Sequence, residues 1–292
     1  MNTSAPSVPV PSAARLLEIA TSAAHAAAEY LRSLDRDHLA REYKTSSHDI
    51  VTEHDRASEE IIVAELRRRL PSARIVGEEG GVRAAEGPAA ESDGPVVSFY
   101  VDPIDGTSNF AAGLPLFCVS IGVSVDDELV AGVIDAPILG QVFAAADGAA
   151  TLNGRPLAPR ATRPAADALV VSGFPGHTIG REFPEFAGRA AVELGEGVSS
   201  VRHLGTAALE LAYVAAGWAD ATALGRINSW DVAAGFHILR RAGGSIRTWP
   251  GTGDAQRPDH LQPAYVACTG PERLEILDAL QDELQALRVP AV

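Results

Sequence analysis

Asp102-Pro-Ile-Asp-Gly-Thr-Ser-Asn-Phe110 is the stretch of this sequence that decides the fold. The run Val96 to Val101 before it is apolar and β-branched, which predicts an inner strand that delivers Asp102 at its carboxyl end. Functional sites gather at such strand ends in layered α/β folds. Asp102 and Asp105 are three residues apart, and Pro103 stiffens the backbone between them, so both carboxylates can turn toward one point. Hard oxygen ligands in that arrangement suit Mg²⁺, and we predict a magnesium site here.

Gly106 and Thr107 extend this predicted site toward an anion. Gly permits a tight turn that exposes backbone N–H groups, and a helix that begins near Ser108 would offer its N-terminus to a phosphate. An isolated Asp-x-x-Asp is more often a helix cap or a surface turn, so the prediction depends on the whole string.

A second acidic motif, Trp230-Asp-Val-Ala-Ala-Gly235, lies far along the chain. It places Asp231 at the start of a predicted helix, where the helix dipole stabilises a carboxylate. By itself this residue would be interpreted as an N-cap. Together with the first motif, it predicts a further oxygen ligand that bridges two lobes across a cleft.

Three more acidic residues have two interpretations each. Glu78 and Glu79 lie in a glycine-flanked turn after a predicted strand, where the backbone can approach another group closely, although a lone Glu-Glu is more often a surface turn. Asp55 precedes a predicted helix and is either its cap or part of the site.

His48 and His54 have no matching Cys or His cluster, which disfavours a zinc site.

The composition describes a globular chain without a basic face. Its 292 residues are 46% hydrophobic and carry a net charge of -14, which argues against nucleic acid and anionic membranes as partners. That charge also repels a phosphate ester, unless bound cations invert the local field. No apolar run approaches the roughly 20 residues of a membrane-spanning helix, and the first residues lack the features of a secretory signal. We therefore predict a cytoplasmic protein, with Cys118 and Cys268 as buried thiols.

The order of predicted elements divides the chain into a flexible tail (1–12), an α+β lobe (13–160) and an alternating α/β lobe (161–292). A polar stretch over 35–55, which contains Lys44, predicts a hairpin or a mobile flap, and residues 82–95 predict an exposed insertion. Helices are predicted over 13–34, 56–70, 182–194, 205–217, 231–242 and 271–287. Strands are predicted over 73–76, 96–101, 116–126, 129–134, 142–146, 169–172, 219–224, 245–248 and 264–267.

Taken in order, the motifs resemble the inositol monophosphatase family. The resemblance rests on Lys44-Thr-Ser-Ser with Asp49, Thr52 to Asp55, Gly77-Glu-Glu, Asp102 to Phe110, Gly205-Thr-Ala-Ala-Leu209 and Trp230 to Gly235. It spans the chain from the first helix to about residue 242. It implies a layered αβαβα sandwich, usually a homodimer, and a Mg²⁺-dependent, lithium-sensitive phosphatase that acts on a small phosphorylated substrate.

The same resemblance implies a role for each matching residue. Glu78, Asp102 and the Ile104 carbonyl would hold a first Mg²⁺, and Asp102, Asp105 and Asp231 a second, with a third, looser ion possible near Glu78. Asp55 and Thr107 would orient the attacking water. The amides of Gly106 and Thr107 would take the phosphate, next to Asp105.

One position departs from the family pattern. Aligned without a gap, the acidic residue that grips inositol hydroxyls in these enzymes falls on Leu224, which cannot accept those hydrogen bonds. Arg226 would contact a second anionic or polar group, or be an ordinary loop arginine, and Ala207 is expected to line the same pocket. We therefore expect a polyol, cyclitol or sugar phosphate as substrate. The alternatives are a histidinol-phosphate phosphatase, a 3′(2′),5′-bisphosphate nucleotidase, or a non-catalytic regulatory homologue.

Overall fold

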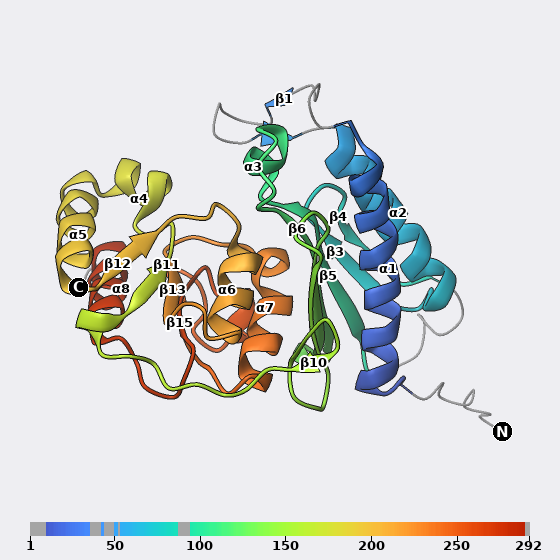
Figure 1. Ribbon diagram of the computed structural model, residues 1–292. Coiled ribbons are helices and arrows are strands. Elements are labelled where there is room, and N and C mark those ends of the chain that lie inside the picture. Colours follow the sequence, from blue (N-terminus) through green and yellow to red (C-terminus); the bar gives the residue numbers. More distant parts are fainter. Residues whose placement is uncertain (1–9, 36–41, 44–49, 52, 87–93, 290–292) are drawn as a thin grey trace.

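The computed structural model describes residues 10–35, 42–43, 50–51, 53–86 and 94–289. In this part of the chain, five layers follow one another: helices, an eight-stranded sheet, helices, a five-stranded sheet and helices (Figure 1). The predicted layered αβαβα arrangement is confirmed.

The eight-stranded sheet has the order β10-β9-β8-β7-β6-β5-β3-β4, and only β3 and β5 pair in parallel. Its strands are β3 (Arg74–Gly77), β4 (Gly81–Arg83), β5 (Val97–Asp105), β6 (Cys118–Val125), β7 (Glu128–Ala136), β8 (Gln141–Ala145), β9 (Thr151–Leu152) and β10 (Arg155–Pro156). Two helices, α1 (Ala13–Ser33) and α2 (Glu53–Arg69), cover its outer face. Ser12 caps α1 by accepting the Arg15 N–H, and the apolar residues of α1 recur at helical spacing against the sheet.

The five-stranded sheet has the order β12-β11-β13-β15-β14. Its strands are β11 (Leu169–Val171), β12 (Ser200–Arg202), β13 (Ala221–Leu224), β14 (Ser245–Trp249) and β15 (Ala264–Cys268). Three helices form the outermost layer on its far side: α4 (Gly176–Glu182), α5 (Pro184–Gly197) and α8 (Glu275–Arg288). In addition, β1 (Glu42–Tyr43) pairs with β2 (Ile50–Val51) as an antiparallel hairpin within the predicted 35–55 segment.

The middle layer consists of α6 (Ala207–Ala215) and α7 (Ser229–Arg241), which pack between the two sheets. Two glycines allow α7 to lie unusually close to the first sheet. A Cβ on Gly122 of β6 would lie 2.4 Å from the Ala233 Cβ, and one on Gly132 of β7 would lie 2.7 Å from the Ala234 carbonyl oxygen. This close approach brings Asp231, in the first turn of α7, toward the end of β5.

Several element boundaries differ from the sequence predictions. α2 begins at Glu53, so Asp55 lies within its first turn and does not precede it. β5 continues through Asp105. Its pairing with β6 is interrupted at Pro103 by a register shift between Asp102 and Asp105, and it resumes at Asp105. Residue Glu182 ends α4, and Pro184 starts the next helix. β4 occupies the start of the predicted insertion, and β12 was not predicted.

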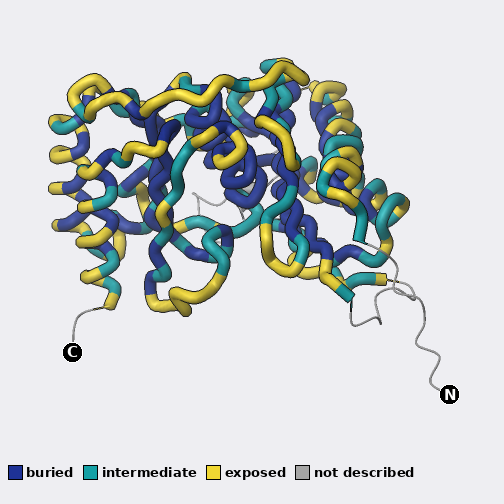
Figure 2. Tube along the Cα trace, turned by 90° about the horizontal axis from the view of Figure 1, so that it is seen from below, coloured by how far each residue is buried: buried dark blue, intermediate teal, exposed yellow. Residues whose placement is uncertain are grey.

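Figure 2 shows the buried segments in the interior of the layers and the exposed ones along the outer helices and loops. Both cysteines are buried free thiols, as predicted. Among the described residues, no helix is both long enough and apolar enough to cross a membrane.

A buried histidine next to the sheet predicts a pH dependence of stability. His260 is 1% exposed and packs edge-on against Tyr100 at 4.9 Å between ring centroids, and its Nε2 has no hydrogen-bond partner among the residues that the structure describes. The pKa of His260 is lowered from 6.5 to about 4, mainly because of burial; the Asp127 charge opposes this shift, and Arg240, Arg257 and Arg74 add to it. Because the folded pKa lies below the unfolded one, stability is complete above about pH 6.5 and falls as the pH drops toward 4.

We expect His260→Phe to remove this loss, which approaches about 3 kcal/mol at pH 4. Urea unfolding of the wild type and the variant between pH 4 and 7.5 measures it. As the pH falls, the unfolding free energy of the wild type should decrease more than that of the variant. Parallel stability curves would contradict the assignment.

Candidate metal and catalytic site

Three aspartates from two distant stretches meet in the interior. The carboxylate oxygens of Asp102 and Asp105, at the end of β5, and of Asp231, in α7, all lie within 4.8 Å of one another. Asp102 and Asp105 are 2% and 7% exposed. Asp102 Oδ1 accepts the Ile104 N–H at 3.1 Å, which orients the carboxylate across the Pro103 turn. The structure therefore brings together the two acidic motifs that the sequence singled out.

Asp105 is anchored by the N-terminus of α6. Its Oδ2 accepts hydrogen bonds from the Thr206 hydroxyl and the Ala208 N–H, both at 2.6 Å, and its Oδ1 accepts the Ala207 N–H at 3.3 Å. Unpaired N–H groups and the helix dipole favour a carboxylate at this position. Because α6 belongs to the middle layer, these bonds fix the end of β5 against it.

Asp231 has a role in α7 that differs from the expected N-cap. Asn228 is the N-cap, and Asp231 is the third helical residue of a capping box, with its Oδ2 accepting the Asn228 N–H at 2.9 Å. The interaction orients one carboxylate oxygen toward the helix start.

The cluster is electrostatically strained in the absence of a cation. Burial raises the pKa of Asp102 well above its usual value, and repulsion from Glu78, Asp105 and Asp231 raises it further. Burial likewise raises the pKa values of Asp105 and Asp231, and the Asp105 charge adds to the effect on Asp231. Desolvated carboxylates this close to one another disfavour the ionised form. A divalent cation would relieve both costs, so the donor set fits such an ion.

Glu78, in the turn between β3 and β4, is not one of the three carboxylates within 4.8 Å, but its charge acts on them. Its charge contributes to the pKa shifts of Asp102 and Asp231, and its N–H donates to the Val101 carbonyl at 3.2 Å. The neighbouring Glu79 has its N–H bound elsewhere, to the Glu59 carboxylate. Of the two glutamates, Glu78 is therefore the one electrostatically coupled to the aspartates.

Asp55 and Thr107 also lie together, as predicted. Asp55 is 1% exposed, and the Thr107 hydroxyl lies 3.1 Å from Asp55 Oδ1 and 3.0 Å from the Ile104 carbonyl oxygen. Gly106 directly precedes Thr107 and has a φ of 95°, a left-handed conformation that favours glycine. The helix after it, α3 (Thr107–Ala111), begins at Thr107 instead of Ser108 and has only five residues, which leaves little helix dipole for an anion.

The predicted substrate-side residues lie on different elements. Leu224 ends β13 beside Gly173, where an added Cβ would lie 3.5 Å from Leu224 Cδ2 and 2.8 Å from His203 Nε2. Arg226 is ion-paired with Glu182 of α4 at 3.0 Å. Ala207 contacts the site through its N–H on Asp105. The flap residue Lys44 lies outside the described residues.

Comparison with known proteins shows which family has this sequence pattern. Residues 12–286 match the sequence profile described as the inositol monophosphatase family. The chain belongs to this family. It is 34% identical over 263 residues to the Nus factor SuhB of Pseudomonas aeruginosa, covering 87% of this chain and 92% of the relative. It is 37% identical over 237 residues to an inositol-1-monophosphatase of Synechocystis, covering 80% and 78%.

The fold agrees with that of solved family members. The inositol monophosphatase of Anabaena (Nostoc) superposes with a TM-score of 0.72 at 32% identity, covering 95% of this chain and 97% of that chain. Family membership and the layered fold are therefore established, and the family is one of phosphatases.

Four residues of this inositol monophosphatase fold support the site without having been singled out from the sequence. Thr206 and Cys118 contact Asp105 Oδ2, the thiol at 3.9 Å. Asn109 donates to the carbonyls of Leu116 and Leu204, both at 2.7 Å, and so ties α3 to the segment before α6. Glu59 lies four residues after Asp55, one helical turn along α2, and that spacing was the available signal.

Proposed function

We propose that the protein is a Mg²⁺-dependent phosphomonoesterase that hydrolyses a small polyol, cyclitol or sugar phosphate. The observation that supports it most is the convergence of three carboxylates within 4.8 Å, two of them buried and the third half-buried, next to the Asp55–Thr107 pair. Oxygen-only donors suit Mg²⁺, and the raised pKa values of Asp102 and Asp231 are consistent with a cluster that a cation would stabilise in its ionised form.

In this proposal Glu78, Asp102 and the Ile104 carbonyl would hold one ion, and Asp102, Asp105 and Asp231 would hold a second. A third, looser ion near Glu78 is part of the same proposal. When bound, the ions supply positive charge that attracts the phosphate, acidify the attacking water and stabilise the departing alkoxide oxygen.

Asp55 and Thr107 position that water. The Thr107 hydroxyl donates a hydrogen bond to the Asp55 carboxylate. Its oxygen can therefore accept a hydrogen bond from the water. The amides of Gly106 and Thr107 take the phosphate oxygens. Asp105 and Ala207, which are joined by a hydrogen bond, belong to the same proposed substrate-binding region. Water attacks phosphorus directly, so no covalent bond to the chain is required.

Phosphate release tests the proposal. Purified protein should release phosphate from at least one small phosphate monoester in the presence of Mg²⁺, and lose this activity in EDTA. Inositol 1-phosphate, fructose bisphosphate, histidinol phosphate and adenosine 3′,5′-bisphosphate form the panel, which also separates the two alternative phosphatases. Because Leu224 cannot accept hydrogen bonds from ring hydroxyls, inositol 1-phosphate should not be the best substrate by a wide margin.

A non-catalytic role is the second candidate, since one relative is named as a Nus factor. The panel distinguishes the two, because a regulatory protein would release no phosphate under any metal condition. All the proposed ligand positions retain oxygen donors, which favours the enzyme.

Three further family traits are part of the proposal: inhibition by Li⁺, assembly as a homodimer, and a cytoplasmic location. Li⁺ titration of the phosphate-release assay measures the first. Sedimentation measures the second, and fractionation of the source cells the third.

Glu59 offers a test of the Glu78 assignment. Its buried carboxylate, 1% exposed, accepts the Glu79 N–H and the Gly80 N–H, each at 2.8 Å, and thereby holds the turn that presents Glu78. A Cβ on Gly77 would lie 2.5 Å from Glu59 Oε2, so the fit depends on glycine. We expect Glu59→Gln to weaken Mg²⁺ binding by about tenfold, measured by calorimetry without substrate, and to lower kcat less at saturating Mg²⁺.

Glu60→Gln is the matched control. Glu60 is exposed and pairs with the same Arg83 that contacts Glu59, but it does not touch the turn. Its Mg²⁺ affinity should equal that of the wild type. Equal affinities in both variants would remove Glu59 from the metal-site support.

A further inference from the structure

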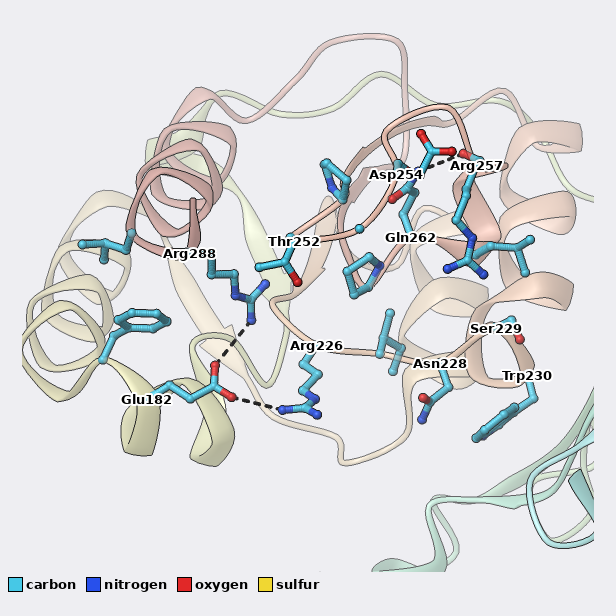
Figure 3. A pocket seen from close by; sticks show the side chains of 18 residues that line it. Glu182, Arg226, Asn228, Ser229, Trp230, Thr252, Asp254, Arg257, Gln262 and Arg288 are labelled. Atoms are coloured by element: carbon cyan, nitrogen blue, oxygen red, sulfur yellow. Dashed lines mark hydrogen bonds and ion pairs between the residues drawn. The ribbon is translucent and has the colours of Figure 1, made fainter. Parts of the chain in front are cut away.

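A second pocket lies in the C-terminal half of the chain (Figure 3). It has a volume of about 700 Å³, and it is enclosed by the end of α4, residues 226–230, the loop 250–263 and the end of α8. A pocket of this size suits a small metabolite. The clustered aspartates at the metal site are not among its lining residues.

The pocket is positively charged although the chain as a whole is acidic. Arg226, Arg257 and Arg288 line it, against only Glu182 and Asp254. The whole chain has 24 Lys and Arg residues against 38 Asp and Glu residues. Since the surroundings are rich in carboxylates, a local excess of guanidinium groups favours an anionic ligand.

Arg288 is the least exposed of these arginines whose ion pairing the structure records. Its side chain is 12% exposed, and its one ion pair in the described part of the chain is with Glu182, at 3.9 Å. Glu182 is shared, because Arg226 pairs with its other oxygen at 3.0 Å. Burial lowers the pKa of Arg288, and the Arg226 charge lowers it further against the opposing effect of Glu182. A guanidinium with five N–H donors thus shares a single, distant carboxylate.

We propose that this pocket binds a small phosphorylated molecule, whose phosphate group replaces the Glu182 carboxylate between Arg226 and Arg288. Figure 3 shows the two arginines on either side of Glu182, joined to it by ion pairs. Phosphate fits because it carries more charge and more acceptor oxygens than one carboxylate, and guanidinium groups bind it in a bidentate manner. Glu182 is 39% exposed and belongs to the short helix α4, so it can turn outward to solvent.

The remaining walls can hold the rest of such a molecule. Asn228, Ser229 and Thr252 present polar side chains, and Trp230 offers a flat aromatic ring at the side of the pocket nearest the first sheet (Figure 3). The segment 226–230 also leads directly into α7, where the Asn228 N–H binds Asp231. The pocket is therefore a separate site that adjoins the metal cluster through one stretch of backbone. This inference does not depend on the proposed reaction.

Binding of inorganic phosphate to metal-free protein tests it, because without Mg²⁺ the acidic cluster repels phosphate and does not compete. Calorimetry and the phosphate-dependent rise in melting temperature are the two measurements. Glu182→Gln frees both arginines and should bind phosphate about tenfold more tightly than the wild type. Arg288→Gln should bind at least about tenfold more weakly, as expected for one charge-assisted interaction.

Glu193→Gln is the matched control. Glu193 is a similarly exposed glutamate on α5, paired with Arg189 at 3.2 Å and outside the pocket, so it makes the same change in net charge. Its phosphate affinity should equal that of the wild type. If Glu182→Gln binds no more tightly than Glu193→Gln, the proposal is overturned. The same holds if a folded Arg288→Gln protein binds like the wild type.

Discussion

Asp102→Asn is expected to lower phosphate release by at least about a thousandfold. Asp102 is the ligand that both proposed ions share, and one of its carboxylate oxygens lies within 4.8 Å of those of Asp105 and Asp231. Asn keeps the shape but loses the charge, so it weakens both ion sites together. Bound ions stabilise the transition-state charge by several kcal/mol, which corresponds to this factor. Steady-state rates over a Mg²⁺ titration measure the loss.

The same variant should be more stable than the wild type in EDTA at pH 7. Burial and the neighbouring carboxylates raise the pKa of Asp102, so its ionised form is disfavoured in the folded state. Stability from this group is present below the unfolded pKa of 3.8 and is lost as the pH rises through the folded pKa. Asn removes that cost because it does not ionise.

Calorimetric melting separates the two effects. In EDTA the variant should melt above the wild type, and Mg²⁺ should raise its melting temperature less. A variant that kept full activity and full stabilisation by Mg²⁺ would contradict the metal-cluster assignment. A variant that lost activity through misfolding would melt lower in EDTA, which is the opposite sign.

The parts of the fold predicted well from sequence are those with local signals. The spacing of Leu16, Ile19 and Ala23 indicated α1, and the helix is observed over Ala13–Ser33. The dipeptide Asn153-Gly154 is typical of a hairpin turn, and both residues have positive φ between β9 and β10. Such features depend on neighbouring residues alone, so one stretch of sequence is enough to specify them.

Features that depend on tertiary contact could not be predicted this way. Asp231 looked like an N-cap because a carboxylate at either position stabilises a helix start, and only the coordinates distinguish the capping-box position. β5 extends past its apolar run because pairing with β6 resumes at Asp105 opposite Cys118. The proposed phosphate pocket is lined by residues 182, 226, 257 and 288, which are too far apart in the sequence for a local pattern to predict that they meet.

The candidate site falls between these cases. Local sequence placed Asp102 and Asp105 together, and the second motif predicted Asp231 as a further ligand, but the choice of Asp55 and Glu78 as site residues came from the family resemblance. The structure shows what makes the approach possible. Glu59 fixes the turn of Glu78, and the N-terminus of α6 fixes Asp105. The position of Asp231 depends on how closely α7 packs on β6 and β7.

Gly122→Ala tests that last dependence, and we expect it to destabilise the protein by about 3 kcal/mol. The new methyl group would lie 2.4 Å from the Ala233 Cβ and 2.7 Å from the Ala233 carbonyl carbon, so it meets helix backbone as well as side chain. Backbone cannot rotate away, and α7 must therefore shift from the sheet. Urea unfolding in EDTA measures the stability loss.

The shift of α7 should also carry Asp231 away from Asp102, so Mg²⁺ affinity should fall in the same variant, measured by calorimetry. Gly188→Ala is the control, because Gly188 lies in α5 and its added methyl group would meet no atom within 4 Å. It should stabilise the protein by about 0.5–1 kcal/mol through helix propensity and leave Mg²⁺ binding unchanged. A Gly122→Ala protein with wild-type stability and Mg²⁺ affinity would show that close packing of α7 does not position the third aspartate.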